Sequence, residues 1–197
     1  RVLLHDAEAF SKSPVERRIF APIIGDGILT AEGASWRWQR RTAAPLFRHA
    51  EIVSHVPAMV AAAERMLSRW TEPGVRAIDA DMTDVTFDVL SATIFSGATP
   101  DEIAALKRHI DRYLDTTSWE IAYGILRLPE WLWHPRKRQM RTAALGLRAT
   151  IDRIIARERA NGWASGGLMA QLGAARDPET GAPTSDVLIA NNLLTFA

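Results

Sequence analysis

Ser35-Trp36-Arg37-Trp38-Gln39-Arg40-Arg41 is the most informative stretch of this 197-residue sequence. Ser35 is predicted to cap a helix that runs through Ala44, before a proline whose ring removes a backbone N–H. Trp36 and Arg40 are one helical turn apart, so both side chains leave one face of this helix. An indole N–H and a guanidinium placed in this way can hold one carboxylate together. A Trp–Arg stack without any ligand is the alternative that the spacing leaves open.

Helical spacing dominates the sequence on both sides of this stretch, and the strict alternation typical of strands is scarce. We therefore predict a mainly α fold. A turn is expected at residues 25–27, a connector at 117–135 and a loop at 177–181, where Gly, Pro or Trp residues gather. Helices are expected at residues 2–10, 17–24, 51–70, from 81 or 83 to about 96, from 100 onward, 136–160, 168–172 and from 184 or 185 to 197.

Three of these helices carry apolar residues at helical spacing, which predicts the faces that they bury. The helix over residues 51–70 has the longest such stripe. The predicted inward residues are Val53, Val56, Met59, Val60, Ala63, Met66, Leu67 and Trp70 in that helix, Ile103, Leu106, Ile110 and Leu114 in the helix from residue 100, and Met140, Leu147, Ile151, Ile154 and Ile155 in the helix over 136–160.

The composition excludes several classes of protein. The 24 basic and 23 acidic residues give a net charge of +1, which argues against a nucleic-acid binder. No stretch has the roughly 18 apolar residues that a membrane span needs, and no signal peptide is evident, so a cytoplasmic protein is expected. Because the chain begins with Arg1 and stops within an apolar helical run, we expect residues 1–197 to be a single incomplete domain of a longer protein.

No residue presents itself as a catalytic group or a metal ligand. The sequence contains no cysteine, and its five histidines lack metal-binding spacing. Asp81, Asp84 and Asp88 could share a helix face and bind Mg²⁺. Together with Asp79, they are better explained as acidic residues near the positive end of a helix.

The sequence resembles the cytochrome P450 family of haem-thiolate monooxygenases, of the bacterial soluble type. Trp36-x-x-x-Arg40 matches a W-x-x-x-R motif of that family, and Pro45-Leu46-Phe47 matches the Pro-x-Phe at the end of the same helix. The other similar segments occur in the family's order over nearly the whole chain. They are Gly25-Asp26-Gly27-Ile28-Leu29-Thr30, Leu128-Pro129-Glu130-Trp131-Leu132, Arg136-Lys137-Arg138, Asp177-Pro178-Glu179-Thr180-Gly181 and Leu193-Leu194-Thr195-Phe196-Ala197.

This resemblance implies a partial cytochrome P450 fold, from before the W-x-x-x-R helix to the first half of the family's central helix. It implies haem b as cofactor, with Trp36 and Arg40 donating hydrogen bonds to a haem propionate. Phe47 and Phe196 would pack near the porphyrin. Ile28 and Leu29 would face the substrate, although core packing is an equal possibility for Leu29. The cysteine ligand of the iron would lie outside this chain, which is therefore expected to be inactive alone.

The activity that the resemblance implies is insertion of one oxygen atom from O₂ into a lipophilic organic substrate. The implied partners are a ferredoxin or flavoprotein reductase, the substrate and O₂, with no nucleic acid and no membrane. Two alternatives of other classes stay open at this point. An all-helical ligand-responsive transcription regulator would need a helix-turn-helix, which the glycines of residues 25–33 interrupt. A helical interaction module would need no small ligand.

Overall fold

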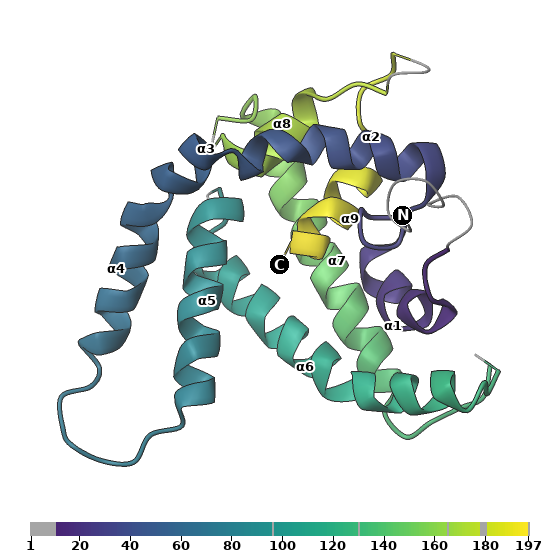
Figure 1. The fold of residues 1–197 in the computed structure, drawn as a ribbon, viewed down its shortest axis with the longest axis horizontal. Helices are drawn as coiled ribbons and strands as arrows, with labels where there is room; N and C mark the ends of the chain where they lie inside the picture. The colour runs from purple at the N-terminus through teal and green to yellow at the C-terminus, as the bar shows by residue number, and fades with distance from the viewer. Residues whose placement is uncertain (1–10, 96, 130, 165, 178–180, 197) are drawn as a thin grey trace, which may run out of the picture.

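The structure is a computed structural model that describes residues 11–95, 97–129, 131–164, 166–177 and 181–196 (Figure 1). These residues form a mainly α fold, which confirms the predicted class, and their only β pairing is an isolated bridge between Arg176 and Pro183. The helix predicted for residues 2–10 lies outside the described residues. The elements are α1 (Pro14–Ile24), α2 (Gly33–Ala43), the 3₁₀ helix η2 (Ala44–Phe47), α3 (His49–Ser54), α4 (Val56–Leu67), α5 (Ile78–Ile94), α6 (Pro100–Ile125), α7 (Lys137–Ala160), α8 (Gly167–Ala174) and α9 (Asp186–Phe196).

The core lies where α7, α8 and α9 meet. Ile151, Ile154 and Ile155 of α7 are buried together with Ile189 and Leu193 of α9. Figure 1 shows α7 running diagonally through the molecule, with α6 packed along it and α9 beside it. The inward face predicted for the helix over 136–160 is therefore confirmed, and it supplies the centre of the fold.

The prediction of one helix over residues 51–70 is wrong in two respects. The structure divides it into α3 and α4 around His55, because Pro57 in the first turn of α4 has no N–H to donate to the preceding turn. The predicted apolar stripe is also mainly exposed, and only Met66 of its members is buried. Figure 1 shows why, since α4 stands at the edge of the molecule and, among the described helices, packs mainly along α5.

Other predicted boundaries also shift. Ser35 does not cap α2, which follows Glu32 as N-cap without a side-chain bond. The helix predicted from residue 81 or 83 begins at Ile78, and α6 continues through residues 117–125, which were predicted as part of a connector. The last helix begins close to the predicted residue 184 or 185, and Ser185 Oγ accepts from the Leu188 N–H at 3.3 Å.

The turn at residues 25–27 forms as predicted and is pressed against α9. Gly25 has a φ of 51°, in the left-handed region that favours glycine. At Gly27, a Cβ atom would lie 2.7 Å from the Asn191 carbonyl oxygen, so only glycine fits there. This close approach sets the path of the following residues, Ile28 and Leu29, over α9.

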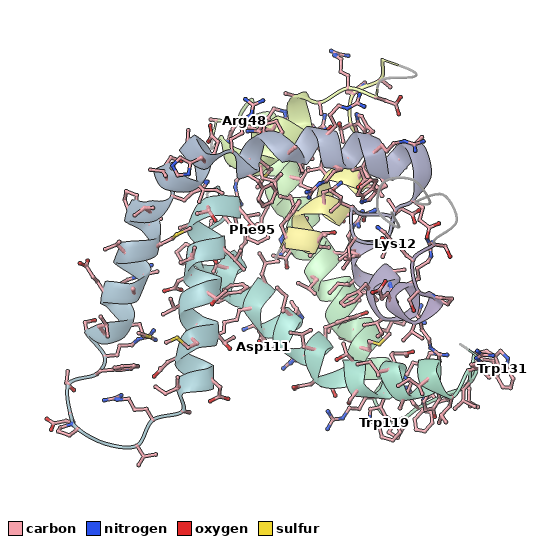
Figure 2. All side chains as sticks on the ribbon, in the orientation of Figure 1. Lys12, Arg48, Phe95, Asp111, Trp119 and Trp131 are labelled. Atoms are coloured by element: carbon pink, nitrogen blue, oxygen red, sulfur yellow. The ribbon has the colours of Figure 1, made fainter. Side chains whose placement is uncertain are left out.

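A buried ionic cluster joins α1 to the end of α6 and to the connector after it. Arg18 Nε donates to Glu120 Oε2 at 2.7 Å, and His134 Nε2 lies 2.8 Å from Glu120 Oε1. Burial opposes the charge on Glu120, but the bonds from Arg18 and His134 outweigh it and lower the pKa of this carboxyl. The ring of Trp119, labelled in Figure 2, stacks on His134 with centroids 6.1 Å apart. The cluster thus ties the connector to α1.

Candidate functional site

Helix α2 is held in place by two polar side chains. Gln39 is buried, and its Nε2 donates to the Asp26 carbonyl and to Ser35 Oγ, at 3.0 Å in each case. Trp38 Nε1 donates to the Arg176 carbonyl at 3.2 Å. These bonds tie α2 to the turn before it and to the segment after α8. Trp36 and Arg40 lie on a different side of α2.

Trp36 and Arg40 keep their polar groups available. Trp36 is 39% exposed, and Arg40 is exposed as well. In the described part of the chain, neither the Trp36 indole N–H nor the Arg40 guanidinium has a hydrogen-bond or ion-pair partner. They are one turn apart on α2, as predicted, and are separate donors, because no stack between the two side chains forms among the described residues. Both groups only donate hydrogen bonds, so the group that they suit is an acceptor, and the charge of Arg40 favours an anion.

Two of the predicted aromatic residues meet. The rings of Phe47, in η2, and Phe196, at the end of α9, have centroids 5.7 Å apart and planes inclined by 45°. Phe47 is 54% exposed, so much of this aromatic surface is uncovered. Residues almost 150 positions apart in sequence thus form one aromatic contact, next to the end of the helix that carries Trp36 and Arg40.

An apolar cavity of about 200 Å³ lies between α1, α6 and α9, and Leu29 lines it. We call this space the inner cavity. Ile28 is not among its lining residues; its backbone N–H instead donates to Asn192 Oδ1 at 3.3 Å. The other lining residues are Phe20, Ile23, Ile24, Ile110, Tyr113, Leu114, Leu194 and Thr195.

Several of these cavity residues were not singled out from the sequence. Ile110 and Leu114 were predicted to face inward, and both reach the inner cavity, although Leu114 is 55% exposed on its open side. Tyr113 was missed because a tyrosine beside this stripe has no distinctive spacing. Its hydroxyl donates to the Ile19 carbonyl, and burial raises the pKa of the phenol. Tyr113 therefore acts as a neutral wall residue.

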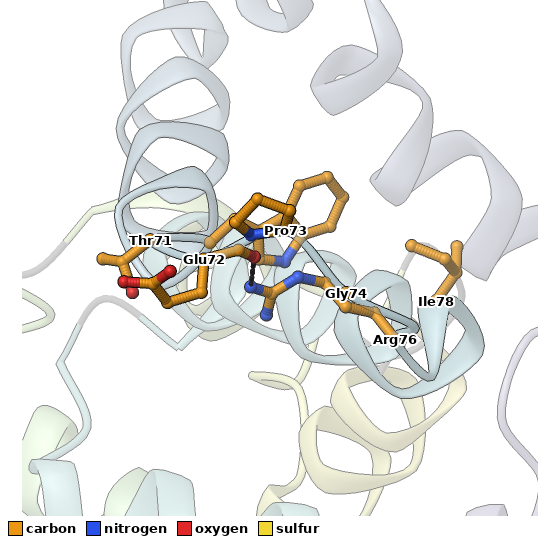
Figure 3. Close-up of a pocket in the computed structure, with 7 residues that line it drawn as sticks. Thr71, Glu72, Pro73, Gly74, Arg76 and Ile78 are labelled. Atoms are coloured by element: carbon orange, nitrogen blue, oxygen red, sulfur yellow. Dashed lines mark hydrogen bonds between the residues drawn. The ribbon is translucent and has the colours of Figure 1, made fainter.

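A second depression, of about 550 Å³, lies far from these residues, in the loop between α4 and α5 (Figure 3). Arg76 stacks over the Trp70 ring at 5.6 Å from its centroid and donates to the Glu72 carbonyl at 3.0 Å. Trp70 Nε1 donates to Asp81 at 2.9 Å. These side chains satisfy one another, so the depression is the surface of a packed loop.

Part of the acidic series in α5 is engaged by basic residues. Asp79 and Asp81 stand in the first turn of α5, near its positive end as predicted, whereas Asp84 and Asp88 lie further along the helix. Asp84 pairs with Lys107 and Arg69, and the hydrogen bond from Lys107 is the main cause that lowers the pKa of this carboxyl. No group of three or more metal-binding side chains occurs within the described ranges.

Comparisons with known proteins show the family of this chain. The family model described as cytochrome P450 matches residues 1–165. This chain belongs to the cytochrome P450 family. It is 27% identical over 176 residues to a cyclooctat-9-en-7-ol 5-monooxygenase of Streptomyces melanosporofaciens, and 32% identical over 191 residues to a bifunctional cytochrome P450/NADPH–P450 reductase of Alternaria alternata. The crystal structure of the cytochrome P450DA heme domain superposes with a TM-score of 0.75 at 24% identity and covers 96% of this chain.

The P450 chain spans only part of these proteins. It covers 38% of the Streptomyces monooxygenase, 17% of the Alternaria protein and 42% of the P450DA chain. The fold is therefore that of a partial cytochrome P450, as predicted. Among the described residues, no helix is both long enough and apolar enough to cross a membrane.

Proposed function

We propose that this chain is part of a cytochrome P450 monooxygenase that inserts one oxygen atom from O₂ into a lipophilic organic substrate. Within it, α2, η2 and the end of α9 would contribute to the haem site, and the inner cavity would form part of the substrate pocket. The unpartnered donors Trp36 and Arg40 on one turn of α2 carry this proposal. The family membership supports it over a transcription regulator or an interaction module.

The donor set fits haem b. A haem propionate is a carboxylate, and the Trp36 N–H and the Arg40 guanidinium supply the charge-assisted hydrogen bonds that such a group needs when it leaves water. The exposed ring of Phe47 beside Phe196 offers apolar surface to the porphyrin. When bound, haem would supply the activation of O₂. Its thiolate ligand would have to lie outside this chain, which has no cysteine, and the chain by itself would be inactive.

The chain's own residues would then bind and orient the substrate and exclude water. The inner cavity is lined mainly by aliphatic and aromatic side chains, which favours a lipophilic substrate. We propose that Leu29 belongs to this pocket. Ile28 would contribute to it through the hydrogen bond of its backbone N–H to Asn192. The electrons would come from a ferredoxin or a flavoprotein reductase, in keeping with the reductase named in the Alternaria relative, and a cytoplasmic setting suits such a partner.

The test is haem retention in the full-length protein. The double variant Trp36→Phe/Arg40→Gln removes both donors and keeps most of the side-chain volume. Two charge-assisted bonds contribute about 1.5–3 kcal/mol each, so haem transfer to apomyoglobin should be at least about tenfold faster. Far-UV circular dichroism would check that the helix content of the variant equals that of the unmodified protein.

A matched control uses the same helix. Arg37→Gln/Arg41→Gln removes two cations of α2 that lie one residue further along, on another side. This variant should lose haem at the rate of the unmodified protein. Equal rates for all three proteins would remove the propionate assignment.

A further inference from the structure

Leu29 reaches the inner cavity from a turn, and hydrogen bonds to the residue before it set where its side chain lies. The N–H of Ile28 donates to Asn192 Oδ1 at 3.3 Å, and the carbonyl of Ile28 accepts from Lys12 Nζ at 2.9 Å. Both bonds fall on the residue directly before Leu29. They therefore fix the point from which the Leu29 side chain enters the cavity.

The two anchors of Ile28 differ in rigidity. Lys12 is half-buried and bonds through the end of a long side chain. Asn192 is 1% exposed, and its Nδ2 donates to the Leu188 carbonyl, one turn earlier in α9, at 3.0 Å. This second bond orients the amide, so that its oxygen is the atom that faces the Ile28 N–H. Asn192 is thus the rigid anchor of the pair.

The turn before Ile28 rests directly on the same stretch of α9. A Cβ atom at Gly27 would lie 2.7 Å from the Asn191 carbonyl oxygen and 2.6 Å from Thr195 Oγ1. Thr195 also lines the inner cavity. One short segment of α9 therefore carries the anchor of Ile28, the seat of Gly27 and part of the cavity wall.

The inner cavity is small enough for the position of one side chain to decide what fits. Its volume of about 200 Å³ lies below the roughly 300–1,000 Å³ of most small-molecule sites. Leu29 is 44% exposed, so its backbone holds it in place more than the packing around it does. Without the Asn192 oxygen, the half-buried N–H of Ile28 would lose its acceptor and turn toward water, and Leu29 would move with it.

We infer that Asn192 is a positioning residue for the substrate: its side-chain oxygen holds Ile28 and thereby sets how far Leu29 enters the inner cavity. Asn192 is not among the residues that line the cavity, so its effect on a ligand passes through Leu29. The inference rests on the proposed function, because it takes the inner cavity as part of the substrate pocket.

The test is ligand selectivity in the full-length, haem-loaded protein. Asn192→Leu keeps the size of the side chain and removes the acceptor, and Asn192→Ala removes the acceptor without adding bulk to a packed helix. In both variants Leu29 should yield to a wider ligand. The Kd of limonene relative to that of 1-decanol, measured from the haem absorbance shift, should therefore fall by at least about threefold. A bond that served stability alone would lower the free energy of unfolding and leave this ratio unchanged.

A double-mutant cycle separates positioning from a direct effect on the ligand. Leu29→Ala should change the ratio by itself, because it shortens the side chain in the cavity. In Leu29→Ala/Asn192→Leu, the second substitution should add nothing, since the side chain through which Asn192 acts has been removed. Additive effects of the two substitutions would contradict the inference.

Arg148→Gln is the matched control, because Arg148 donates to the neighbouring Asn191 Oδ1 at 2.6 Å and does not line the inner cavity. It should lower the free energy of unfolding and leave the ratio unchanged. An unchanged ratio in both Asn192 variants, or an equal change in Arg148→Gln, would overturn the inference while the proposed function stands. If the full-length protein showed no absorbance shift with either ligand, the proposed function would fall and this inference with it.

Discussion

Leu29 is the sequence-predicted pocket residue that lines the inner cavity. It is 44% exposed and lines a space of only about 200 Å³. In Leu29→Phe, the larger ring should occupy part of this space and leave less room for a ligand. We expect the Kd of 1-decanol or limonene, measured from the haem absorbance shift of the full-length protein, to change at least threefold.

Ile28→Leu serves as the control, because Ile28 lies beside Leu29 and meets α9 through its backbone. This variant should leave the ligand-induced shifts unchanged. Identical shifts in Leu29→Phe and the unmodified protein, with both ligands, would reduce Leu29 to a packing residue.

Among single residues, those related by helical spacing could be placed from the sequence, and the buried anchor of α2 could not. Trp36 and Arg40 could be paired from helical spacing, which depends on one element only. Gln39, their neighbour, was not foreseen as the buried anchor of α2, because its bond to the Asp26 carbonyl depends on where the preceding turn is packed. The same reason explains Ser35, whose hydroxyl accepts from Gln39 instead of capping the helix.

At the scale of elements, α6 and α7 are joined by an ion pair that makes stability depend on pH. The Arg157 guanidinium donates to the two Glu102 carboxylate oxygens at 2.7 and 2.8 Å, and to the Gly97 carbonyl at 2.7 Å. The bond from Arg157, aided by those from Thr99, lowers the pKa of Glu102 from 4.5 to about 2. This carboxylate therefore stabilises the fold fully above pH 4.5, and its contribution is lost as the pH falls toward 2.

Glu102→Gln should reduce the free energy of unfolding of the full-length protein by about 2 kcal/mol at pH 7, because it weakens charge-assisted bonds. Urea denaturation at several pH values is the measurement. The difference between the variant and the unmodified protein should shrink as the pH is lowered from 5 toward 2. Asp101→Asn, an exposed neighbour in the same turn, should change the stability much less. A difference that is constant with pH would contradict the assigned role of Glu102.

The elements were predictable where local chemistry decides them. The start of α6 follows from Thr99, Pro100 and Glu102, which form a capping box with proline in the first turn. The end of α6 was not predictable in this way. Residues 117–125 contain no strong helix breaker, and their helix is held by contacts of Glu120 with α1 and the connector. The break before α4 was missed because a long apolar stripe outweighed a single proline in the prediction.

For the whole molecule, the exposed apolar stripe of α3 and α4 could not be predicted from the sequence pattern. Periodicity showed correctly that one side of these helices is apolar, but it could not show what would cover it. In this chain Val53, Met59 and Val60 remain exposed. The chain spans 38% of its Streptomyces relative, so much of a full-length P450 has no counterpart among the packing partners available here.

The central claim is that this chain contributes to a haem site, and the haem content of the full-length protein tests it most directly. The gene product, translated to its stop codon, would be purified, supplied with haemin and examined by absorption spectroscopy. The account predicts a Soret band with haem bound in stoichiometric amount, and a marked loss of that band in Trp36→Phe/Arg40→Gln. A folded full-length protein that binds no haem would contradict it.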